Sequence, residues 1–354
     1  VVCSVVRLLI IGGALLGSAG VAAEQPLYTA AIEVAAQTAS EERRALRAGL
    51  VEVLVKLSGQ RDVEQSAVVR AALEAPRDYT SSFGFVVESS STLRVEFSPS
   101  AIDQLLRSAG LSVWPAQRRP LLLWLQVDRL PLGSHWVDYN SDPDLVELIG
   151  AVMASRGQPW RLPEFDLRDR LAVADNRALL LDDQLLSTAS ARYQGDRPHW
   201  AALRLVTNSD GVARGHWLQA IDQQRHAGEL VSAAELEQWQ QWLHASVDRL
   251  VEQEAYLPLR DNSELQLTVA GIGSMASYRA LLAVLATIEP LVAVELSGLD
   301  SNRVALTAAT ESSRQQVIAA LLSSGYFAQP AGAADAGDDR SAAAIELLWR
   351  GRSE

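Results

Sequence analysis

Residues 119–128, RPLLLWLQVD, contain the longest uninterrupted apolar run outside the N-terminal leader, and this run decides how the chain is divided. It is bounded by Pro120 and Asp128, and it is short and apolar enough for a strand that is buried on both faces of a sheet. We therefore expect it to be the first strand of a central domain, with one α/β unit before it and further structure after it.

The composition limits the class of protein. The chain has 354 residues, 48% of them hydrophobic, so it is long enough for two or three domains with sizeable cores. Its formal net charge of −12 makes it a poor generic binder of nucleic acid or anionic lipid. We expect an α+β protein made of three small α/β units.

The N-terminus has the layout of a secretory signal peptide. Arg7 is followed by the apolar run Leu8 to Leu16 and then by small residues through Ala23. Cleavage of residues 1–23 is therefore expected, which places the mature chain in the periplasm without an integral membrane span. The alternative is an uncleaved anchor helix, but the run falls short of the ~20 residues that a span needs. Cys3, the only cysteine, lies in this leader, so we expect no disulfide or thiol chemistry in the mature chain.

Residues 24–116 are predicted to form the first unit. A strand over Leu27 to Ala35 is followed by a long amphipathic helix and a short second helix. A hairpin between Phe83 and Phe97 and a helix from Ser100 to Ser108 come next, and Leu111 to Trp114 is a candidate for a closing strand. With one extra helix, this is the βαββαβ order of a ferredoxin-like unit.

Four segments of this region also resemble a known family. They are ERRALRAGLVEVLVKLSG (42–59), FSPSAIDQLLRSAGLSVW (97–114), the RPLLLWL strand and GQPWRLPEFDLRD (157–169). Together they are similar to a proteobacterial exported family known as domain of unknown function two thousand and sixty-six. The resemblance covers roughly Gln25 to Asp169 well and the rest loosely. It implies export, but the family has no established activity, so it implies no catalytic residue.

Residues 117–256 are predicted to form the central unit, a mixed sheet in β-α-β-α-β-β-α order. A polar loop from Pro131 to Pro143 precedes its first helix, and Asn208 to Gly211 suit the tight turn of a hairpin. Ser232 and Glu235 are spaced as a capping box at the start of a long helix. The layout resembles the N-terminal domain of the TolB translocation protein and that of lipoprotein activators of penicillin-binding proteins, which is an analogy of fold alone.

The remainder is predicted to be a second ferredoxin-like unit, residues 257–330, again in βαββα order. Residues 331–343, AGAADAGDDRSAA, have the composition of a flexible linker. Within the C-terminal strand and tail, residues 344–354, Ile345 to Trp349 are apolar enough to return as an edge strand.

Gly271, Gly273 and Ala276 fit the glycine fingerprint of dinucleotide binding, after a strand and before a helix. However, the next two strands are joined by only the short turn 298–302, so they must be antiparallel, which the parallel nucleotide-binding fold does not allow at that place. We therefore expect an ordinary strand-to-helix turn and no cofactor.

A cluster of acids is the best candidate for catalytic carboxylates or a metal. Its members are Glu164, Asp166, Asp169, Asp175, Asp182 and Asp183. Asp166 and Asp169 are the residues of first interest, but Arg161, Arg168, Arg170 and Arg177 lie among the acids, which favours surface ion pairs. The five histidines have no metal-binding spacing, and no nucleophile motif is present, so neither a metal site nor a catalytic residue is assigned.

Seven of the nine tryptophans fall in the central unit. Such residues are most often core and rim, but they also line grooves for peptide or glycan. Trp136, Tyr139 and Trp160 lie in or beside loops at strand ends, so they are the candidate groove for a ligand or partner.

The expected function is therefore binding. The sequence favours an exported, non-catalytic protein that binds a protein of the cell envelope or a peptidoglycan-associated component. Two alternatives remain open: a hydrolase or metal-dependent enzyme that uses the acids of residues 164–183, and a periplasmic carrier of a small ligand.

Overall fold

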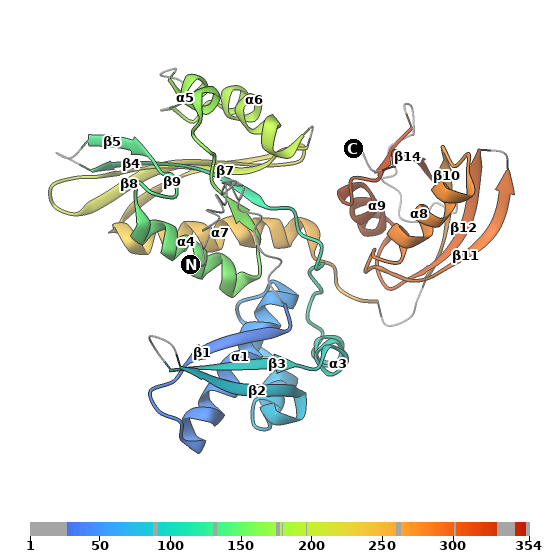
Figure 1. The fold of residues 1–354 in the computed structure, drawn as a ribbon, viewed down its shortest axis with the longest axis horizontal. Coiled ribbons are helices and arrows are strands. Elements are labelled where there is room, and N and C mark those ends of the chain that lie inside the picture. Colours follow the sequence, from blue (N-terminus) through green and yellow to red (C-terminus); the bar gives the residue numbers. More distant parts are fainter. Residues whose placement is uncertain are drawn as a thin grey trace, which may run out of the picture.

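The computed structural model describes residues 27–87, 91–129, 133–174, 178, 180–195, 197–259, 263–300, 302–330 and 344–351. They form an α+β protein with three sheets, each with its own hydrophobic core (Figure 1). The expected signal peptide and the expected flexible linker lie outside the described residues. No helix of the described ranges is long and apolar enough to cross a membrane.

The N-terminal unit is a three-stranded antiparallel sheet, in the order β1-β3-β2, packed against helix α1. Thr38 caps the start of α1, and Gly59 ends the helix in the left-handed conformation. Leu46, Leu50 and Leu54 of α1 are fully buried, so its apolar stripe faces the sheet. The elements are β1 (Thr29–Glu33), α1 (Ala39–Ser58), the 3₁₀ turn η1 (Val63–Gln65), α2 (Ala67–Ala72), the 3₁₀ turn η2 (Pro76–Tyr79), β2 (Thr80–Val87), β3 (Ser91–Phe97) and α3 (Pro99–Ala109).

The closing strand expected at Leu111 to Trp114 does not join this sheet. Val113 forms a single antiparallel bridge with Tyr256, at the end of the central unit. Trp114 is buried in the core of the central unit, and its backbone N–H donates to the carbonyl of Leu57 over 2.7 Å. The segment therefore joins two units instead of completing one, and the ferredoxin-like assignment of the first unit is not confirmed.

The central unit confirms that the apolar run is a strand buried on both faces. Strand β4 (Leu121–Arg129) pairs with β7 in parallel and with β5 antiparallel, and the sheet runs β5-β4-β7-β8-β9, with the short β6 also beside β4. Leu121, Leu123 and Leu125 face the core under α4 and α7, whereas Leu122 and Trp124 face the core under α5 and α6 (Figure 1). The other elements are β5 (Gly133–Trp136), α4 (Pro143–Arg156), β6 (Trp160–Arg161), α5 (Leu167–Val173), α6 (Asp183–Gln194), β7 (His199–Thr207), β8 (Val212–Ile221), β9 (Gln224–Ala234) and α7 (Glu235–Glu254).

Three expectations for this unit were incomplete or wrong. The polar loop before α4 contains β5, and the sequence analysis missed both α5 and β9. The capping box of Ser232 and Glu235 is wrong, because Ser232 lies within β9 and the N-cap of α7 is Ala234. Glu235 instead accepts hydrogen bonds from Arg129 and from the Thr207 hydroxyl. The sheet is mixed, as expected, but the likeness to TolB is not confirmed.

The C-terminal unit is a five-stranded sheet in the order β11-β12-β10-β14-β13. β11 and β12 are antiparallel, which is the pairing predicted from the short turn at residues 298–302. β14 is not the edge strand that the sequence predicted, because it runs parallel to β10 on one side and pairs with the short β13 on the other. This arrangement does not confirm a ferredoxin-like unit. The elements are β10 (Ser263–Ala270), α8 (Met275–Leu285), β11 (Leu291–Asp300), β12 (Arg303–Thr310), α9 (Arg314–Ser323), β13 (Phe327–Ala328) and β14 (Ile345–Trp349).

Candidate functional site

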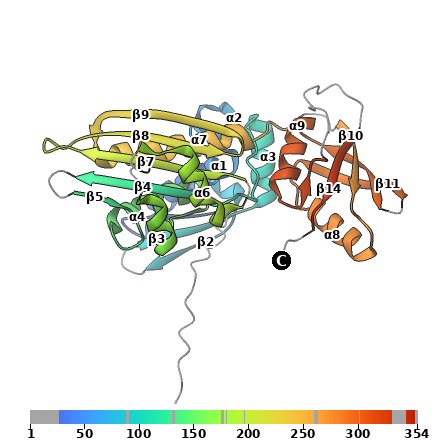
Figure 2. The same cartoon turned by 90° about the horizontal axis from the view of Figure 1, so that it is seen from above.

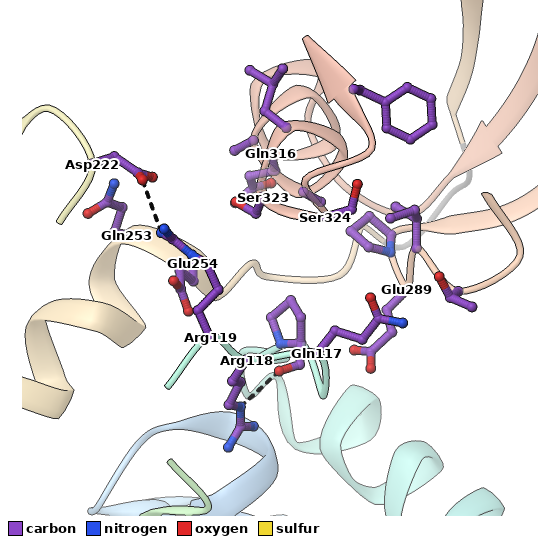
Figure 3. Close-up of a pocket in the computed structure, with 18 of the residues that line it drawn as sticks. Gln117, Arg118, Arg119, Asp222, Gln253, Glu254, Glu289, Gln316, Ser323 and Ser324 are labelled. Carbon is purple, nitrogen blue, oxygen red and sulfur yellow. Dashed lines mark hydrogen bonds and ion pairs between the residues drawn. The ribbon is translucent and has the colours of Figure 1, made fainter. Parts of the chain in front are cut away.

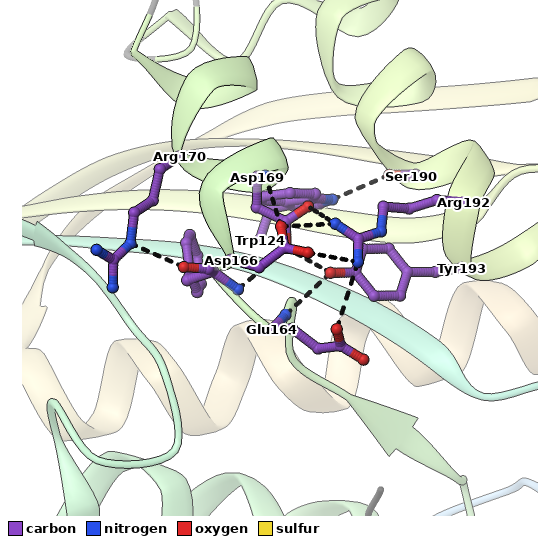
Figure 4. Close-up of polar contacts among 9 residues, drawn as sticks. Trp124, Glu164, Asp166, Asp169, Arg170, Ser190, Arg192 and Tyr193 are labelled. Atoms are coloured by element: carbon purple, nitrogen blue, oxygen red, sulfur yellow. Dashed lines mark hydrogen bonds and ion pairs between the residues drawn. The ribbon is translucent and has the colours of Figure 1, made fainter.

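The acidic residues gather around one arginine that the sequence analysis did not select. Arg192, on α6, contacts Asp166 over 2.7 Å, Asp169 over 3.2 Å and Glu164 over 3.3 Å (Figure 4). Asp166 also caps α5 by accepting from the backbone N–H of Asp169. The Arg192 guanidinium lowers the pKa of Asp166 to about 2, so this carboxylate is held ionised as a partner of a cation.

Asp169 is the buried member of the cluster, with 1% of its surface exposed. It accepts hydrogen bonds from the backbone N–H of Phe165 and from the Tyr193 hydroxyl in addition to Arg192. Burial raises the pKa of Tyr193, which therefore stays protonated and donates. All of the contacts hold α5 against α6, so the geometry is that of a structural cluster.

The other acids of the sequence cluster lie elsewhere. Asp182 caps α6, Asp183 pairs with Arg225 over 2.8 Å, and Asp175 lies outside the described residues. Among the described residues, no group of three or more His, Cys, Asp or Glu side chains is placed to hold a metal ion.

The three aromatic residues of the candidate groove do not share one surface. Trp136 packs edge-on against Trp124, with ring centroids 6.1 Å apart, in the core beneath α5 and α6. Trp160 packs against the opposite core, beneath α4 and α7, and lies 6.1 Å from Tyr139. The Tyr139 hydroxyl accepts from the backbone N–H of Leu162. The sheet thus separates Trp136 from the other two.

A cavity lies where the three units meet, and no sequence pattern predicted it. It has a volume of about 810 Å³ and is lined by side chains of all three units (Figure 3). This volume is in the range of pockets for small molecules, and junctions between domains are a common place for them.

The wall from the central unit is charged. Arg119 contacts Asp222 over 3.0 Å, and Arg197 contacts the same carboxylate over 2.6 Å, so two guanidinium groups share one carboxylate. Gln253 and Glu254, at the end of α7, lie beside them (Figure 3). The Oε1 atom of Gln253 is buried and has no hydrogen-bond partner.

Two carboxylates with raised pKa values line the same cavity. Burial raises the pKa of Glu254. Its carboxylate accepts a hydrogen bond from the indole N–H of Trp114 over 3.1 Å. Burial also raises the pKa of Glu289, which lies between α8 and β11 in the C-terminal unit. Its carboxylate accepts a hydrogen bond from the backbone N–H of Ala116 over 2.8 Å. Carboxylates with raised pKa values in a cavity are a feature of binding and reactive sites.

The wall from the C-terminal unit is mixed. Ala319, Ala320, Ser323 and Ser324 come from α9 and its C-terminal end, and Phe327 follows in β13. Polar and charged side chains of the same unit also line the cavity, namely Glu289, Gln316, Gln329 and Arg350. The cavity therefore offers an occupant polar contacts on both walls, beside a small apolar area on α9.

The comparisons with known proteins found a match to a family model over the first unit. Residues 22–115 match DUF8605, a domain of unknown function. This is not the family that the sequence resemblance suggested, although the coarser expectation of an uncharacterised domain is confirmed. The match ends at Pro115, within the segment that lines the cavity. No curated protein and no solved structure matches the chain.

Proposed function

We propose that this protein is an exported binding protein that receives a short segment of a cell-envelope protein in the cavity between its three units and does not transform it. The observation that carries the proposal is the cavity itself, since residues of all three units line it and the central and C-terminal units contribute polar and charged side chains. The export part rests on the signal-peptide pattern of residues 1–23.

The arrangement of the cavity favours binding over chemistry. The charged groups are engaged with one another, as in the Arg119–Asp222–Arg197 cluster. Glu254 and Glu289 each accept a hydrogen bond from another part of the chain, which fixes them as walls of the cavity. Together with the Arg119–Asp222–Arg197 cluster, they offer a segment several directed polar contacts.

Site-specific photo-crosslinking in cells tests this proposal. A photoreactive amino acid at Gln253 or Ser324 places the probe on opposite walls of the cavity, and Leu236, exposed near the start of α7, is the control position. We expect both cavity positions to give an adduct of the same mass and the control to give none. Adducts that are equally strong at all three positions would contradict a site in the cavity.

A carrier of a small ligand is the second candidate, and the cavity volume of about 810 Å³ favours it. Native mass spectrometry of the protein purified from the periplasmic fraction distinguishes the two. A co-purified small molecule that the Gln253→Ala variant loses supports the carrier. A mass that matches the chain without a small molecule, together with a protein adduct in the photo-crosslinking experiment, supports the first proposal.

A further inference from the structure

Strand β11 is the outer edge of the C-terminal sheet (Figure 1). It has ten residues, whereas the other edge strand of that sheet, β13, has two. An edge strand presents backbone N–H and C=O groups that have no partner in the sheet, and natural proteins usually protect a long one with charges, prolines or a covering segment.

Large apolar side chains are exposed along β11. Val292 is 55% exposed, Leu296 51% and Leu299 69%. Leu296 and Leu299 lie opposite the buried core residues Leu306 and Val304 of β12, so they are on the side of the sheet that carries the core. In the part of the chain that the structure describes, β11 has no strand on its outer side, so an additional strand there would cover these side chains.

Among the edge strands that the structure describes, β11 alone has three such side chains. β2 carries one exposed large apolar residue, Phe83, and β9, although eleven residues long, carries none in the part whose side chains are described. The combination of length and exposed apolar surface therefore singles out β11.

The opposite side of the same sheet is acidic. Glu295 of β11 pairs across the sheet with Thr307, and successive cross-strand pairs place Glu264 of β10 and Glu346 of β14 on the same face. Asp300 and Arg303, a pair at the end of the β11–β12 hairpin, share that face. The carboxylates outnumber the guanidinium group, so the open face attracts cations.

We propose that the free edge of β11 binds an extended segment of another polypeptide as an added antiparallel strand. Main-chain hydrogen bonds supply affinity in this mode, and alternating side chains supply specificity. The segment carries apolar residues on the side of Leu296 and Leu299 and Lys or Arg on the side of Glu295. This binding does not depend on the function proposed for the cavity.

The charges select a basic partner over a second copy of this chain. Antiparallel pairing of β11 with itself would place the Glu295 and Asp300 carboxylates of both copies on one face, and like charges on paired strands are destabilising. Each copy also carries a formal net charge of −12, which opposes self-association. A segment with Lys or Arg at alternate positions places no like charges opposite Glu295 and Asp300 and is not repelled by the negative net charge of this chain.

Defined peptides test the proposal with the mature chain. The probe is a labelled ten-residue peptide that alternates Val and Lys, compared with an alternating Val and Glu peptide and with a Val and Lys peptide N-methylated at alternate residues. The N-methylated peptide keeps the charge and the apolar side chains but lacks half of the donors for a β-ladder. We expect fluorescence anisotropy to show binding of the first peptide only, and hydrogen exchange to show slower exchange in residues 291–300.

Two substitutions locate the binding to β11. Leu296→Lys and Leu299→Lys place a charge on an edge that is already exposed, and each should weaken binding of the Val and Lys peptide by roughly tenfold or more. Leu236→Lys, at an equally exposed leucine of the central unit, should leave binding unchanged. Circular dichroism confirms that each variant is folded.

Three outcomes would overturn the proposal. Equal binding of the N-methylated peptide would show attraction by charge alone. No binding of the Val and Lys peptide to the folded protein would remove the added strand altogether. A concentration-dependent dimer in sedimentation, lost in Leu296→Lys, would show that the occupant is a second copy.

Discussion

Glu311 of the C-terminal unit accepts two hydrogen bonds from Arg107 at the end of α3, with Nη2–Oε1 and Nε–Oε2 distances of 3.1 and 3.2 Å. The Tyr256 hydroxyl donates to the same Oε1 atom over 3.1 Å. This carboxylate therefore joins all three units, which Figure 2 shows from above. The three largest cores share no residue, so polar contacts of this kind set the position of the C-terminal unit.

Glu311→Gln should loosen the attachment of the C-terminal unit to the other two. The neutral amide has one acceptor oxygen, so it cannot accept both hydrogen bonds from the charged Arg107 guanidinium. A hydrogen bond to a charged partner contributes about 1.5–3 kcal/mol. Spin labels on cysteines introduced at Val68 and Met275, both exposed, report the distance between the first and last units. We expect a broader distance distribution in Glu311→Gln than in Glu41→Gln, which removes an exposed ion pair within α1. Identical distributions would show that Glu311 does not hold the junction.

The acidic cluster should behave as a structural element. Asp169→Asn leaves Arg192 without its buried partner and weakens the bond from Tyr193, so the free energy of unfolding should fall by about 3 kcal/mol. Asp166→Asn should lower the free energy of unfolding by much less than Asp169→Asn, since Asp166 is exposed and Asn also caps helices well. Urea denaturation measures both. If both variants were as stable as the native protein but had lost a measured enzymatic turnover, the acids would be catalytic residues instead.

The sequence predicted best those elements whose pattern is local. The run from Leu121 to Leu125 alternates between two cores, and only a strand between two layers of helices accommodates apolar side chains at five successive positions. The helical repeat of Leu46, Leu50 and Leu54 likewise follows from spacing alone. Both were predictable because the periodicity of buried residues is set by the backbone geometry.

Pairings between distant segments could not be predicted. Leu111 to Trp114 is apolar enough for a strand, but its partner is Tyr256, more than a hundred residues away, and nothing in the composition of either segment indicates that pairing. The cavity was missed for the same reason, because Ala116, Arg119 and Glu289 come together only when the three units are packed. The acids at 164–169 were predicted as a group, but their common partner Arg192 lies one helix further on.

The burial of His199 should make stability depend on pH. Burial and the neighbouring Arg119 lower the pKa of this imidazole to about 3, whereas it is about 6.5 in an unfolded chain. The unfolded state therefore binds the extra proton first, so the stabilising contribution is complete above about pH 6.5 and is lost as the pH falls toward 3. The slope from one such group is at most about 1.4 kcal/mol per pH unit.

His199→Gln should flatten this part of the profile. Urea denaturation between about pH 4.5 and 7 measures the difference between the variant and the native protein. Glu254 and Glu289 have raised pKa values and act with the opposite sign, because their protonation on acidification favours the folded state. Their contribution is the same in both proteins and cancels in the difference. Parallel profiles would show that His199 is not the titrating group.

Arg118 should be the least replaceable residue at the junction. Its guanidinium is buried and donates to the carbonyls of Lys56 in α1, of Gly157 after α4 and of Trp114, and it lies 3.6 Å above the Trp114 ring. Burial lowers its pKa to about 9, and backbone carbonyls supply its direct hydrogen-bond partners.

Arg118→Lys keeps the charge but has a single nitrogen, which cannot reach carbonyls of both units at once. Each buried carbonyl left without a donor costs about 1–3 kcal/mol, so the free energy of unfolding should fall by about 3 kcal/mol or more. Arg350→Lys is the matched control, because Arg350 also lines the cavity but is exposed, and it should change stability by less than about 0.5 kcal/mol. Thermal and urea unfolding measure both variants. A loss in Arg118→Lys no larger than in the control would mean that the Arg118 guanidinium does not hold the first two units together.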